Sequence, residues 1–370
     1  MAKLETFCNI NMGQSPDSAT YNTEGKGLPF FQGNADFGDI HPQTRVWCSA
    51  PTKVADAGDV LISVRAPIGA LNIANEKCCI GRGLAALTVD SSLCEQKYLW
   101  YGLESKIDEL NAKGTGSTFK AINKKSLAET EINLPPLDEQ RRIAAVLDKV
   151  TDLIAQRRAQ LDKLDLLVKS RFVEMFGDPA CSTRWPTKKL SQLGELNRGV
   201  SKHRPRNDPA LLGGPYPLIQ TGDVSNSGLY ITEYSASYSE LGLAQSRLWK
   251  AGTLCITIAA NIAQTSILTF DSCFPDSVVG FIPGNETNAI FMHYWFGFFQ
   301  KILEEQAPQV AQKNINLKIL SDLDVIIPPC DLQESFSCFV RNIEKTKLTI
   351  YQSLDKLQIM RKSIMQSCFG

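Results

Sequence analysis

The sequence predicts an α+β fold in which two mixed α/β modules are each followed by a long α-helix of the coiled-coil type. Three observations predict this fold: an internal repeat, a heptad pattern inside the repeat, and a shared order of short apolar strands ahead of each copy. They divide the 370 residues into four segments. These are a first module at 1–135, a helix at 136–178, a second module at 179–328 and a helix at 329–370.

Residues 122–177 and 315–370 form the internal repeat. The two stretches align without a gap, every position of the second lies 193 residues after its counterpart, and 16 of the 56 positions are identical. The identical positions include an opening Ile-Asn pair, a double proline, a glutamine and a closing Phe-Gly pair. A gapless match of this length indicates a duplication, which gives the chain a pseudo-two-fold internal repeat.

Each copy carries the apolar pattern of a coiled-coil helix. Apolar residues recur at alternating spacings of four and three, as in a helix that packs along a partner helix. These residues are Ile143, Leu147, Val150, Ile154, Leu161, Leu164, Val168 and Met175 in the first copy, and Phe336, Val340, Ile343, Ile350, Leu354, Leu357, Ile364 and Cys368 in the second. Proline pairs at 135–136 and 328–329 precede the first turn, where proline is tolerated. A helix of about 36 residues spans roughly 54 Å, too long for one compact core.

Basic residues interrupt this apolar seam at four positions: Arg157, Arg171, Lys347 and Arg361. A charged residue on a coiled-coil seam can fix the pairing register or face a partner helix. A frayed seam fits the same pattern, so all three interpretations stay open.

The two modules share a strand order but differ in their loops. Val60–Val64, Leu71–Ala74 and Leu84–Val89 are predicted strands of the first module, and Gly252–Ile258 repeats the segment Gly58–Val64 with an offset of 194 residues. The basic loop at 202–206 has no counterpart in the first module. Different loops on a common scaffold are typical of two recognition modules with different targets.

The composition restricts the functional classes. Lys and Arg together number 39, as do Asp and Glu, so any nucleic-acid binding must come from local patches rather than from a net positive field. The eleven cysteines form no CxxC pair and the three histidines are widely separated, which argues against a metal site. No apolar run is long enough to span a bilayer and no signal peptide is recognisable. We therefore expect a cytoplasmic protein without membrane association.

The motifs of catalysis are absent from the sequence. It has no phosphate-binding GxxxxGK[ST] loop, and Gly114-Thr115-Gly116 lacks both the third glycine and the preceding strand of a dinucleotide-binding loop. The double prolines lack the preceding Asp or Asn and the following aromatic residue that adenine methyltransferases use to hold the target amine. We expect a non-catalytic protein that binds no cofactor of its own.

Basic and polar loop residues are the candidates for DNA contact, because hydroxyls and amines suit phosphates while Gln and Arg suit base edges. Those on loops ahead of the repeats are Lys113, Ser117, Thr118, Lys120, Gln312 and Lys313. The strongest local basic cluster consists of Lys202, Arg204 and Arg206. The alternative is that all of these are ordinary solvated loop residues.

The repeated motif carries a resemblance. Two variable segments, each followed by I-N-x(10)-[LI]-P-P-x-[DE]-x-Q and by a long helix ending in Phe-Gly, resemble the specificity (S) subunit of type I restriction–modification systems. The likeness covers essentially the whole chain. The first copy, LPPLDEQRRIAAVLDKV, is close to the family pattern, whereas the second departs from it at Cys330, Leu332, Glu334 and Ser335.

The resemblance implies a DNA-binding subunit whose two modules are target recognition domains. Each would read one half of a bipartite, asymmetric site in double-stranded DNA. The two helices would pair as an antiparallel coiled coil and would set the spacing between the halves. The helices would also dock two modification subunits, which would carry S-adenosylmethionine and methylate adenine, and motor-nuclease restriction subunits would join for cleavage. The helix residues that we assign to this docking are Gln140, Arg141, Arg142, Arg157, Gln333 and Arg361.

Two alternatives remain beside this hypothesis. The chain could be the specificity subunit of an enzyme that joins cleavage and methylation in one partner polypeptide. It could instead be a coiled-coil scaffold whose globular ends bind protein or glycan. Salt-dependent, sequence-specific DNA binding in the presence of a methyltransferase partner would exclude the scaffold.

Overall fold

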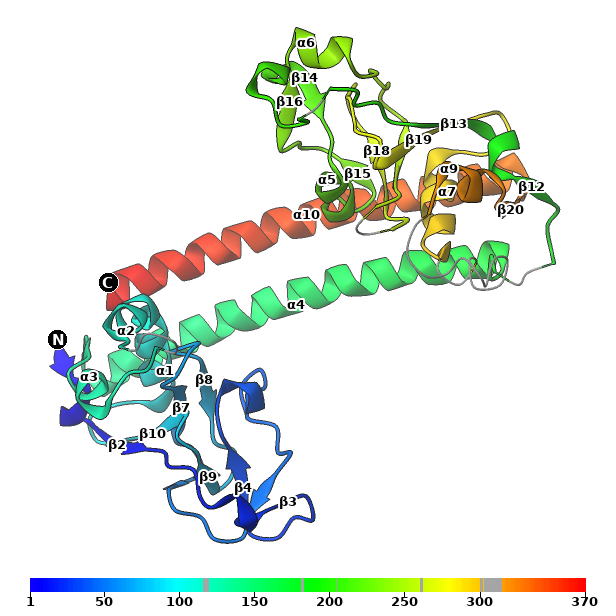
Figure 1. The fold of residues 1–370 in the computed structure, drawn as a ribbon. Helices are drawn as coiled ribbons and strands as arrows, with labels where there is room; N and C mark the ends of the chain where they lie inside the picture. The colour runs from blue at the N-terminus through cyan, green and yellow to red at the C-terminus, as the bar shows by residue number, and fades with distance from the viewer. Residues whose placement is uncertain (116–119, 181–182, 204, 260–261, 300–301, 303–314) are drawn as a thin grey trace. The chain divides into compact units, whose positions relative to one another are not determined.

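The computed structural model describes residues 1–115, 120–180, 183–203, 205–259, 262–299, 302 and 315–370 (Figure 1). They form two compact units: unit 1 comprises Met1–Arg158 and Gln352–Gly370, and unit 2 comprises Ala159–Tyr351. Both predicted long helices are present, as α4 (Leu137–Phe176) and α10 (Cys330–Phe369). The predicted α+β class, with two modules and two long helices, is confirmed.

Unit 1 contains two larger sheets and one short strand pair. The antiparallel four-stranded sheet has the order β2 (Cys8–Met12), β10 (Leu84–Val89), β7 (Val60–Ser63), β8 (Leu71–Ile73). The five-stranded sheet has the order β3 (Tyr21–Asn22), β5 (Trp47–Cys48), β4 (Leu28–Phe31), β9 (Cys78–Ile80), β6 (Val54–Ala55). Strand β1 (Ala2–Lys3) pairs with β11 (Glu131–Ile132). All four residues of β7 are buried, which agrees with the apolar run of its first three residues, Val60, Leu61 and Ile62.

The helices of unit 1 are short apart from the two long ones. They are α1 (Gln96–Ser105), α2 (Ile107–Lys113) and α3 (Lys124–Ala128), with 3-10 turns η1 (Leu4–Thr6), η2 (Ser18–Thr20) and η3 (Asn34–Asp36). Helices α1 and α2 are separated at Lys106, whose φ of −103° and ψ of 6° leave the helical region.

Unit 2 repeats the sheet plan of unit 1 with longer connections. Its main sheet has the order β13 (Gly194–Arg198), β19 (Val278–Pro283), β17 (Leu254–Thr257), β18 (Thr265–Leu268), β15 (Tyr230–Ile231). The remaining strand pairs are β14 (Leu212–Leu218) with β16 (Ala236–Tyr238), and β12 (Thr187–Lys189) with β20 (Asp324–Ile326). The helices are α5 (Thr221–Asn226), α6 (Glu240–Ala244), α7 (Ala289–Phe296) and α9 (Leu317–Ser321), with 3-10 turns η4 (Leu190–Gln192) and η5 (Pro209–Leu211).

The strand register establishes the duplication inside the modules as well as in the helices. Leu84 pairs with Ser63 in unit 1, and Val278 pairs with Thr257 in unit 2. Each of these unit 2 residues lies 194 positions after its counterpart. Equivalent strands therefore pair in the same register, so positions in the loops beyond them can be matched between the units.

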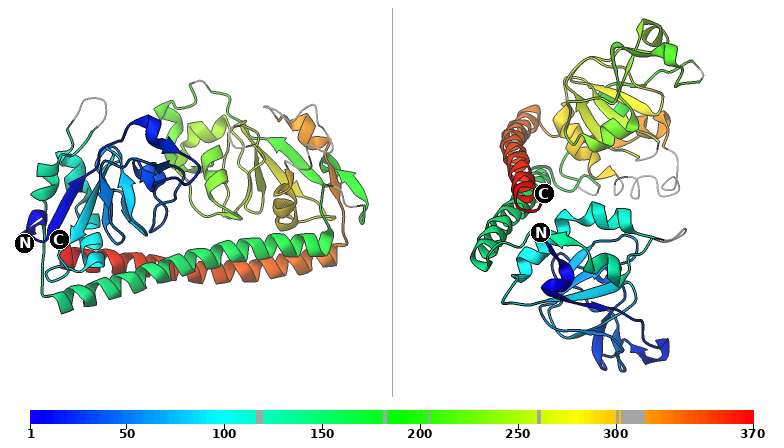
Figure 2. Two further views of the ribbon diagram at one scale, coloured as in Figure 1. Left: turned by 90° about the horizontal axis from the view of Figure 1, so that it is seen from below. Right: turned by 90° about the vertical axis from the view of Figure 1, so that its left-hand side faces the viewer.

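In each unit a segment of α4 runs antiparallel to a segment of α10 (Figure 2). In unit 1, Arg361 Nε of α10 lies 3.2 Å from Thr151 Oγ1 of α4. In unit 2, Lys347 Nζ of α10 lies 2.5 Å from Asp165 Oδ1 of α4. The predicted seam residues Leu147, Leu161 and Val168 are buried, as expected for an apolar seam.

The closing Phe-Gly pair of each repeat has a structural reason. Phe369, at the end of α10, is buried in unit 1, where its ring centre lies 4.8 Å from that of Tyr98. Phe176, at the end of α4, is buried in unit 2, 5.0 Å from the ring of Phe291. Gly177 follows with a φ of +81°, which glycine adopts without strain. Each long helix thus starts in the core of one unit and ends in the core of the other.

No described helix is both long enough and apolar enough to span a membrane. The ten cysteines within the described ranges are free thiols. Burial raises the pKa of the Cys8, Cys78 and Cys94 thiols to about 12, so these groups stay protonated at neutral pH.

Candidate nucleic-acid interface

The predicted DNA-contact residues are only partly visible in the structure. Ser117, Thr118, Arg204, Gln312 and Lys313 lie outside the described residues. The others, Lys113, Lys120, Lys202 and Arg206, are all exposed.

Of the two described candidates in unit 1, Lys120 has the better position. Lys113 ends α2 and its ammonium is bound to Glu109 Oε1 at 2.6 Å, so its charge is partly neutralised. The carbonyl oxygen of Lys120 accepts a hydrogen bond of 3.1 Å from Ala66 N. This bond places Lys120 beside the loop that follows β7.

The loop after β7 forms one wall of a polar cleft of about 380 Å³ in unit 1. The lining residues are Ser15, Ser18, Tyr21, Gln32, Gly33, Asn34, Arg65, Ala66, Arg82 and Gly83. Arg65 and Arg82 are exposed, and neither forms an ion pair with any residue in the described ranges. Two free guanidinium groups among hydroxyls and amides form a surface suited to phosphates and base edges.

The β7–β10 register brings the two arginines together. Ser63 of β7 pairs with Leu84 of β10. The hydrogen bond of 2.9 Å from Val64 N to Gly83 O extends this antiparallel pairing by one residue on each strand. The next step sets Arg65 opposite Arg82. Neither residue stood out in the sequence, because the 16 intervening residues conceal their proximity. Extending the register of the predicted strands 60–64 and 84–89 would have found the pair.

The carboxylate of Asp36, which lies two residues after the lining residue Asn34, has other partners than these arginines. Asp36 accepts a hydrogen bond of 2.7 Å from Gln32 N and forms an ion pair with Arg45. Its charge is therefore already compensated, which leaves the cleft with a local excess of positive charge despite the neutral chain.

The corresponding region of unit 2 is built from different charges. Arg206 Nη2 forms an ion pair with Asp276 Oδ1 at 2.5 Å, and Arg198 Nε donates to the backbone oxygen of Asp276 at 3.0 Å. Lys202 N donates to Gln245 Oε1 at 2.6 Å, which anchors the backbone of the basic loop while its side chain stays exposed. Asp276 thus brings Arg206 together with Arg198, a residue that the sequence analysis missed.

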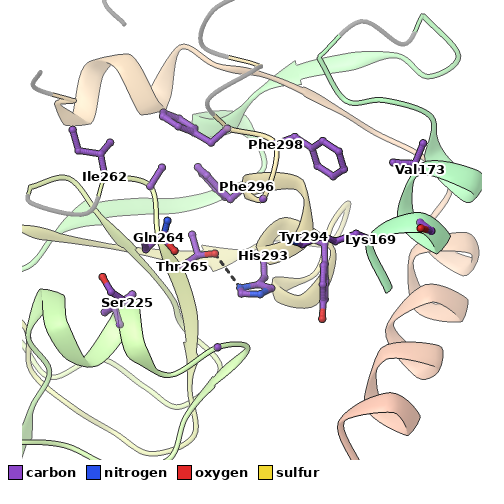
Figure 3. A pocket seen from close by; sticks show the side chains of 16 residues that line it. Lys169, Val173, Ser225, Ile262, Gln264, Thr265, His293, Tyr294, Phe296 and Phe298 are labelled. Carbon is purple, nitrogen blue, oxygen red and sulfur yellow. Dashed lines mark hydrogen bonds between the residues drawn. The ribbon is translucent and has the colours of Figure 1, made fainter. Parts of the chain in front are cut away.

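Unit 2 also contains a cavity of about 800 Å³ (Figure 3). Its described lining includes Tyr294, Phe296 and Phe298, and Lys169 is the only lysine or arginine in that lining. His293 Nδ1 lies 3.0 Å from Thr265 Oγ1, and burial lowers the pKa of His293 to about 4, so its ring is neutral. A lining with one lysine and several aromatic and aliphatic side chains offers little to a phosphate backbone, and we do not assign the cavity to DNA.

Two of the predicted docking residues have a different role. Gln140 is fully buried: its Nε2 donates to Leu93 O at 2.9 Å and to Pro135 O at 2.7 Å. Gln333 is buried as well, and its Nε2 donates to Glu286 O and Pro328 O, both at 2.9 Å. These side chains tie the start of each long helix to its module and are not available to a partner. We therefore reassign Gln140 and Gln333 from docking to helix anchoring.

The predicted docking arginines fall into two groups. Arg141 and Arg142 are exposed on the first turns of α4, and their ion-pair partners among the described residues are Asp138 and Glu139 of the same helix. Arg157 is half-buried. Arg361 Nη2 binds both carboxylate oxygens of Glu104, at 2.8 and 2.6 Å, within unit 1. Arg361 thus sets the register of α10 in unit 1 rather than presenting a free charge to a partner.

The long helices also expose apolar side chains. Eight of them on α4 and α10 are at least 40% exposed: Val146, Leu166, Leu167, Val173, Leu348, Tyr351, Ile359 and Met360. Single exposed apolar residues are common on protein surfaces, but such a number on two paired helices is typical of a helix face that another protein covers.

The fold and the interface define a class of protein: two copies of one α+β module with differing polar loops, each joined to a long helix. The family model described as type I restriction modification DNA specificity domain matches residues 1–164 and 183–358, nearly the whole chain. The chain belongs to this family.

Individual relatives are similar to different extents. A type I restriction enzyme MjaX specificity subunit of Methanocaldococcus jannaschii is 44% identical over 161 residues, which is 44% of this chain and 38% of that subunit. The type I restriction enzyme EcoBI specificity subunit of Escherichia coli is 21% identical over 99% of this chain and 84% of its own length.

Two solved structures share the fold. The S subunit of a type I restriction-modification system from M. genitalium has a TM-score of 0.60 at 16% identity, covering 100% of this chain and 95% of that chain. A chain from a structure that concerns complex assembly and conformational transition of the type I R-M system has a TM-score of 0.63 at 17% identity, covering 99% and 96%.

Proposed function

We propose that this chain is the DNA-specificity subunit of a type I restriction–modification complex and is not itself catalytic. Each module reads one half of a bipartite, asymmetric site in double-stranded DNA. The duplication carries this proposal: two modules share a strand register yet present an unpaired Arg65–Arg82 surface in one and an Arg206–Asp276 pair in the other. One scaffold with two differently charged surfaces suits the recognition of two different sequences.

The exposed surfaces of the two long helices indicate which proteins bind this chain. The exposed apolar residues of α4 and α10, with Arg141 and Arg142, provide the surface on which two modification subunits dock. Those subunits carry S-adenosylmethionine and methylate adenine, and motor-nuclease subunits join them for cleavage. Such a complex acts in the cytoplasm, where the DNA is.

The test is to map methylation. The chain is co-expressed with its modification subunit in a host that lacks adenine methylation, and N6-methyladenine is located by single-molecule sequencing. We expect one bipartite, asymmetric motif with a methylated adenine in each half. If both proteins are soluble and assembled but no new methylation appears, the recognition role is wrong and the scaffold alternative gains support.

A further inference from the structure

We propose that Arg82 is a specificity-determining residue of the first module, whose guanidinium reads a guanine in the major groove, while Arg65 and Lys120 bind phosphate beside it. This inference rests on the proposed function and names one base that the first module recognises. It assigns different tasks to these cations on the grounds of the residues that surround each one and of comparison with the second module.

The chemistry of the arginine side chain selects the base. A guanidinium presents parallel N–H donors, and guanine is the base whose major-groove edge offers two adjacent acceptors, O6 and N7. The Arg82 side chain is exposed at the cleft and is not held by any carboxylate of the described chain. It is therefore available to make both hydrogen bonds to guanine.

The backbone beneath Arg82 is fixed. Arg82 N donates to Ser15 Oγ at 3.3 Å, and Gly81 N donates to Phe31 O at 2.8 Å. A Cβ on Gly83 would lie 2.2 Å from Gln32 O, so only glycine allows the strand to approach the neighbouring loop this closely. A side chain on such a support loses less freedom on binding than one on a loose loop, which suits discrimination between bases.

The second module carries the opposite charge at the equivalent position. Val64 N donates to Gly83 O at 2.9 Å in unit 1, and Ile258 N donates to Ser277 O at 3.0 Å in unit 2. The shared offset of 194 residues therefore matches Arg82 with Asp276. The Asp276 carboxylate is bound by Arg206. A carboxylate has no proton to donate to guanine, so the second module cannot make the same contact.

Arg65 has different neighbours. It forms an isolated bridge with Ala121, and the bond of 3.1 Å from Ala66 N to Lys120 O holds the loop of Arg65 against the segment that carries Lys120. The equivalent of Arg65 in unit 2 is the uncharged Ala259. Two exposed lysine and arginine residues on adjoining segments suit phosphate oxygens, which require charge but little geometric precision.

The experiment compares Arg82→Ala and Arg65→Ala in the complex with the modification subunit. Binding is measured on the mapped site and on duplexes in which each base pair is replaced in turn, at several salt concentrations. We expect Arg82→Ala to weaken binding to the mapped site about 10- to 100-fold, with no further loss when one particular guanine is replaced. Arg65→Ala should weaken binding to all duplexes alike and reduce the salt slope by about 1.

A matched control is Lys77→Ala, which removes an exposed cation of the same unit that pairs with Asp56 outside the cleft. Thermal unfolding of all three variants verifies that the module stays folded. The assignment is overturned if Arg82→Ala weakens binding to all duplexes equally or does not weaken binding at all. It is also overturned if the variant relaxes the preference at a base other than guanine, or in both half-sites. Absence of any bipartite motif for the unmodified chain would instead contradict the proposed function.

Discussion

Gln140 and Gln333 show how a single repeated residue anchors each half of the molecule. In both units the glutamine amide donates to the carbonyl of the first proline of the double proline, Pro135 or Pro328, and to a loop carbonyl 47 residues earlier in the chain. The sequence predicted that these glutamines matter, but it placed them on a docking surface. Periodicity does not reveal burial at a helix start, because the neighbouring loop comes from a distant part of the chain.

Replacing Gln140 with Leu removes three hydrogen bonds at once. Glu95 N and the carbonyls of Leu93 and Pro135 would lose their partner in a buried site. We expect unit 1 to lose about 1–3 kcal/mol of unfolding free energy, measured by denaturant titration. Gln156→Leu, at an exposed position of the same helix, should change stability by less than about 0.5 kcal/mol. Equal stability of the two variants would contradict the anchoring role.

His293 gives unit 2 a defined pH response. Burial is the main cause that lowers its pKa to about 4, and the charge of Lys347 lowers it further. The unfolded chain has the ordinary histidine pKa of about 6.5 and takes up a proton first as the pH falls. Titration of His293 therefore leaves the unfolding free energy of unit 2 unchanged above about pH 6.5. It lowers this free energy as the pH falls from about 6.5 to about 4.

We expect the unfolding free energy of unit 2 to fall by about 1–3 kcal/mol between pH 6.5 and pH 4 on account of this histidine. The upper figure applies to full burial, and the partial opening of the ring to the cavity reduces it. His293→Gln keeps a polar side chain at the site and should remove this part of the slope. If the unfolding free energy of His293→Gln depends on pH as steeply as that of the unsubstituted protein, groups other than His293 cause the pH dependence.

At the scale of elements, two cross-helix contacts set the register of the long helices. The step from Lys347 to Arg361 along α10 and the step from Asp165 back to Thr151 along α4 are both fourteen residues, or two heptads. The sequence left open whether these basic residues fix the register, face a partner or fray. Within the units Lys347 and Arg361 contact the opposite helix, which favours the first interpretation for these two residues.

Lys347 is buried against two carboxylates, Asp165 at 2.5 Å and Glu344 at 2.7 Å. Its burial disfavours the charge, but these two hydrogen bonds outweigh that effect and raise its pKa. Lys347→Ala leaves both carboxylates uncompensated, so we expect a loss of about 1–3 kcal/mol, moderated because Asp165 is half exposed. The exposed neighbour Lys345 serves as control: Lys345→Ala should have little effect in the same denaturant titration. Similar losses for both would contradict the register role.

A matched deletion tests whether the helices set the distance between half-sites. Removing 155–161 from α4 and 351–357 from α10 takes out one facing heptad from each and keeps the seam in register. One heptad rises roughly 10 Å, or about 3 base pairs of DNA. We expect the spacer of the methylated motif to shorten by about that amount with both half-sites unchanged. A spacer of the original length would contradict the idea.

The sequence predicted the elements better than the site. The repeat, the heptads and the strands at 60–64 and 84–89 follow from local periodicity, and the structure confirms them. The Arg65–Arg82 cleft depends on strand register and on loops from four parts of the chain, none of which carries a local signal. The small strands β3, β5 and β6 escaped prediction for a related reason, since two residues cannot display a period.

At the scale of the whole molecule, unit 1 is discontinuous in sequence and unit 2 is continuous. Phe369 and Arg361 belong to unit 1 although more than 190 residues separate them from the rest of it. Deleting 352–370 should therefore disturb the distant unit and leave the adjacent one intact. We expect hydrogen exchange to accelerate around Tyr98 and Leu147, while Phe281 and Trp295 stay protected.

A single substitution distinguishes the loss of the Phe369 packing from the loss of the whole segment 352–370. Phe369→Ala removes only the aromatic ring that packs on Tyr98, and should cost unit 1 about 3–5 kcal/mol. Met360→Ala, at an exposed position of the same helix, is the matched control. Faster exchange in unit 2 than in unit 1 after either the deletion or Phe369→Ala would contradict this assignment.

Because α10 starts in unit 2 and ends in unit 1, the two units cannot complete folding in the order in which they are synthesised. The ribosome completes all of unit 2 before it adds residues 352–370, so the module made first must wait for the last turns of α10 before its core can close. During that interval Tyr98, Ala144 and Leu147 lack their cover and are open to chaperones or to wrong partners. A nascent chain of this protein is therefore vulnerable at its oldest end rather than at its newest.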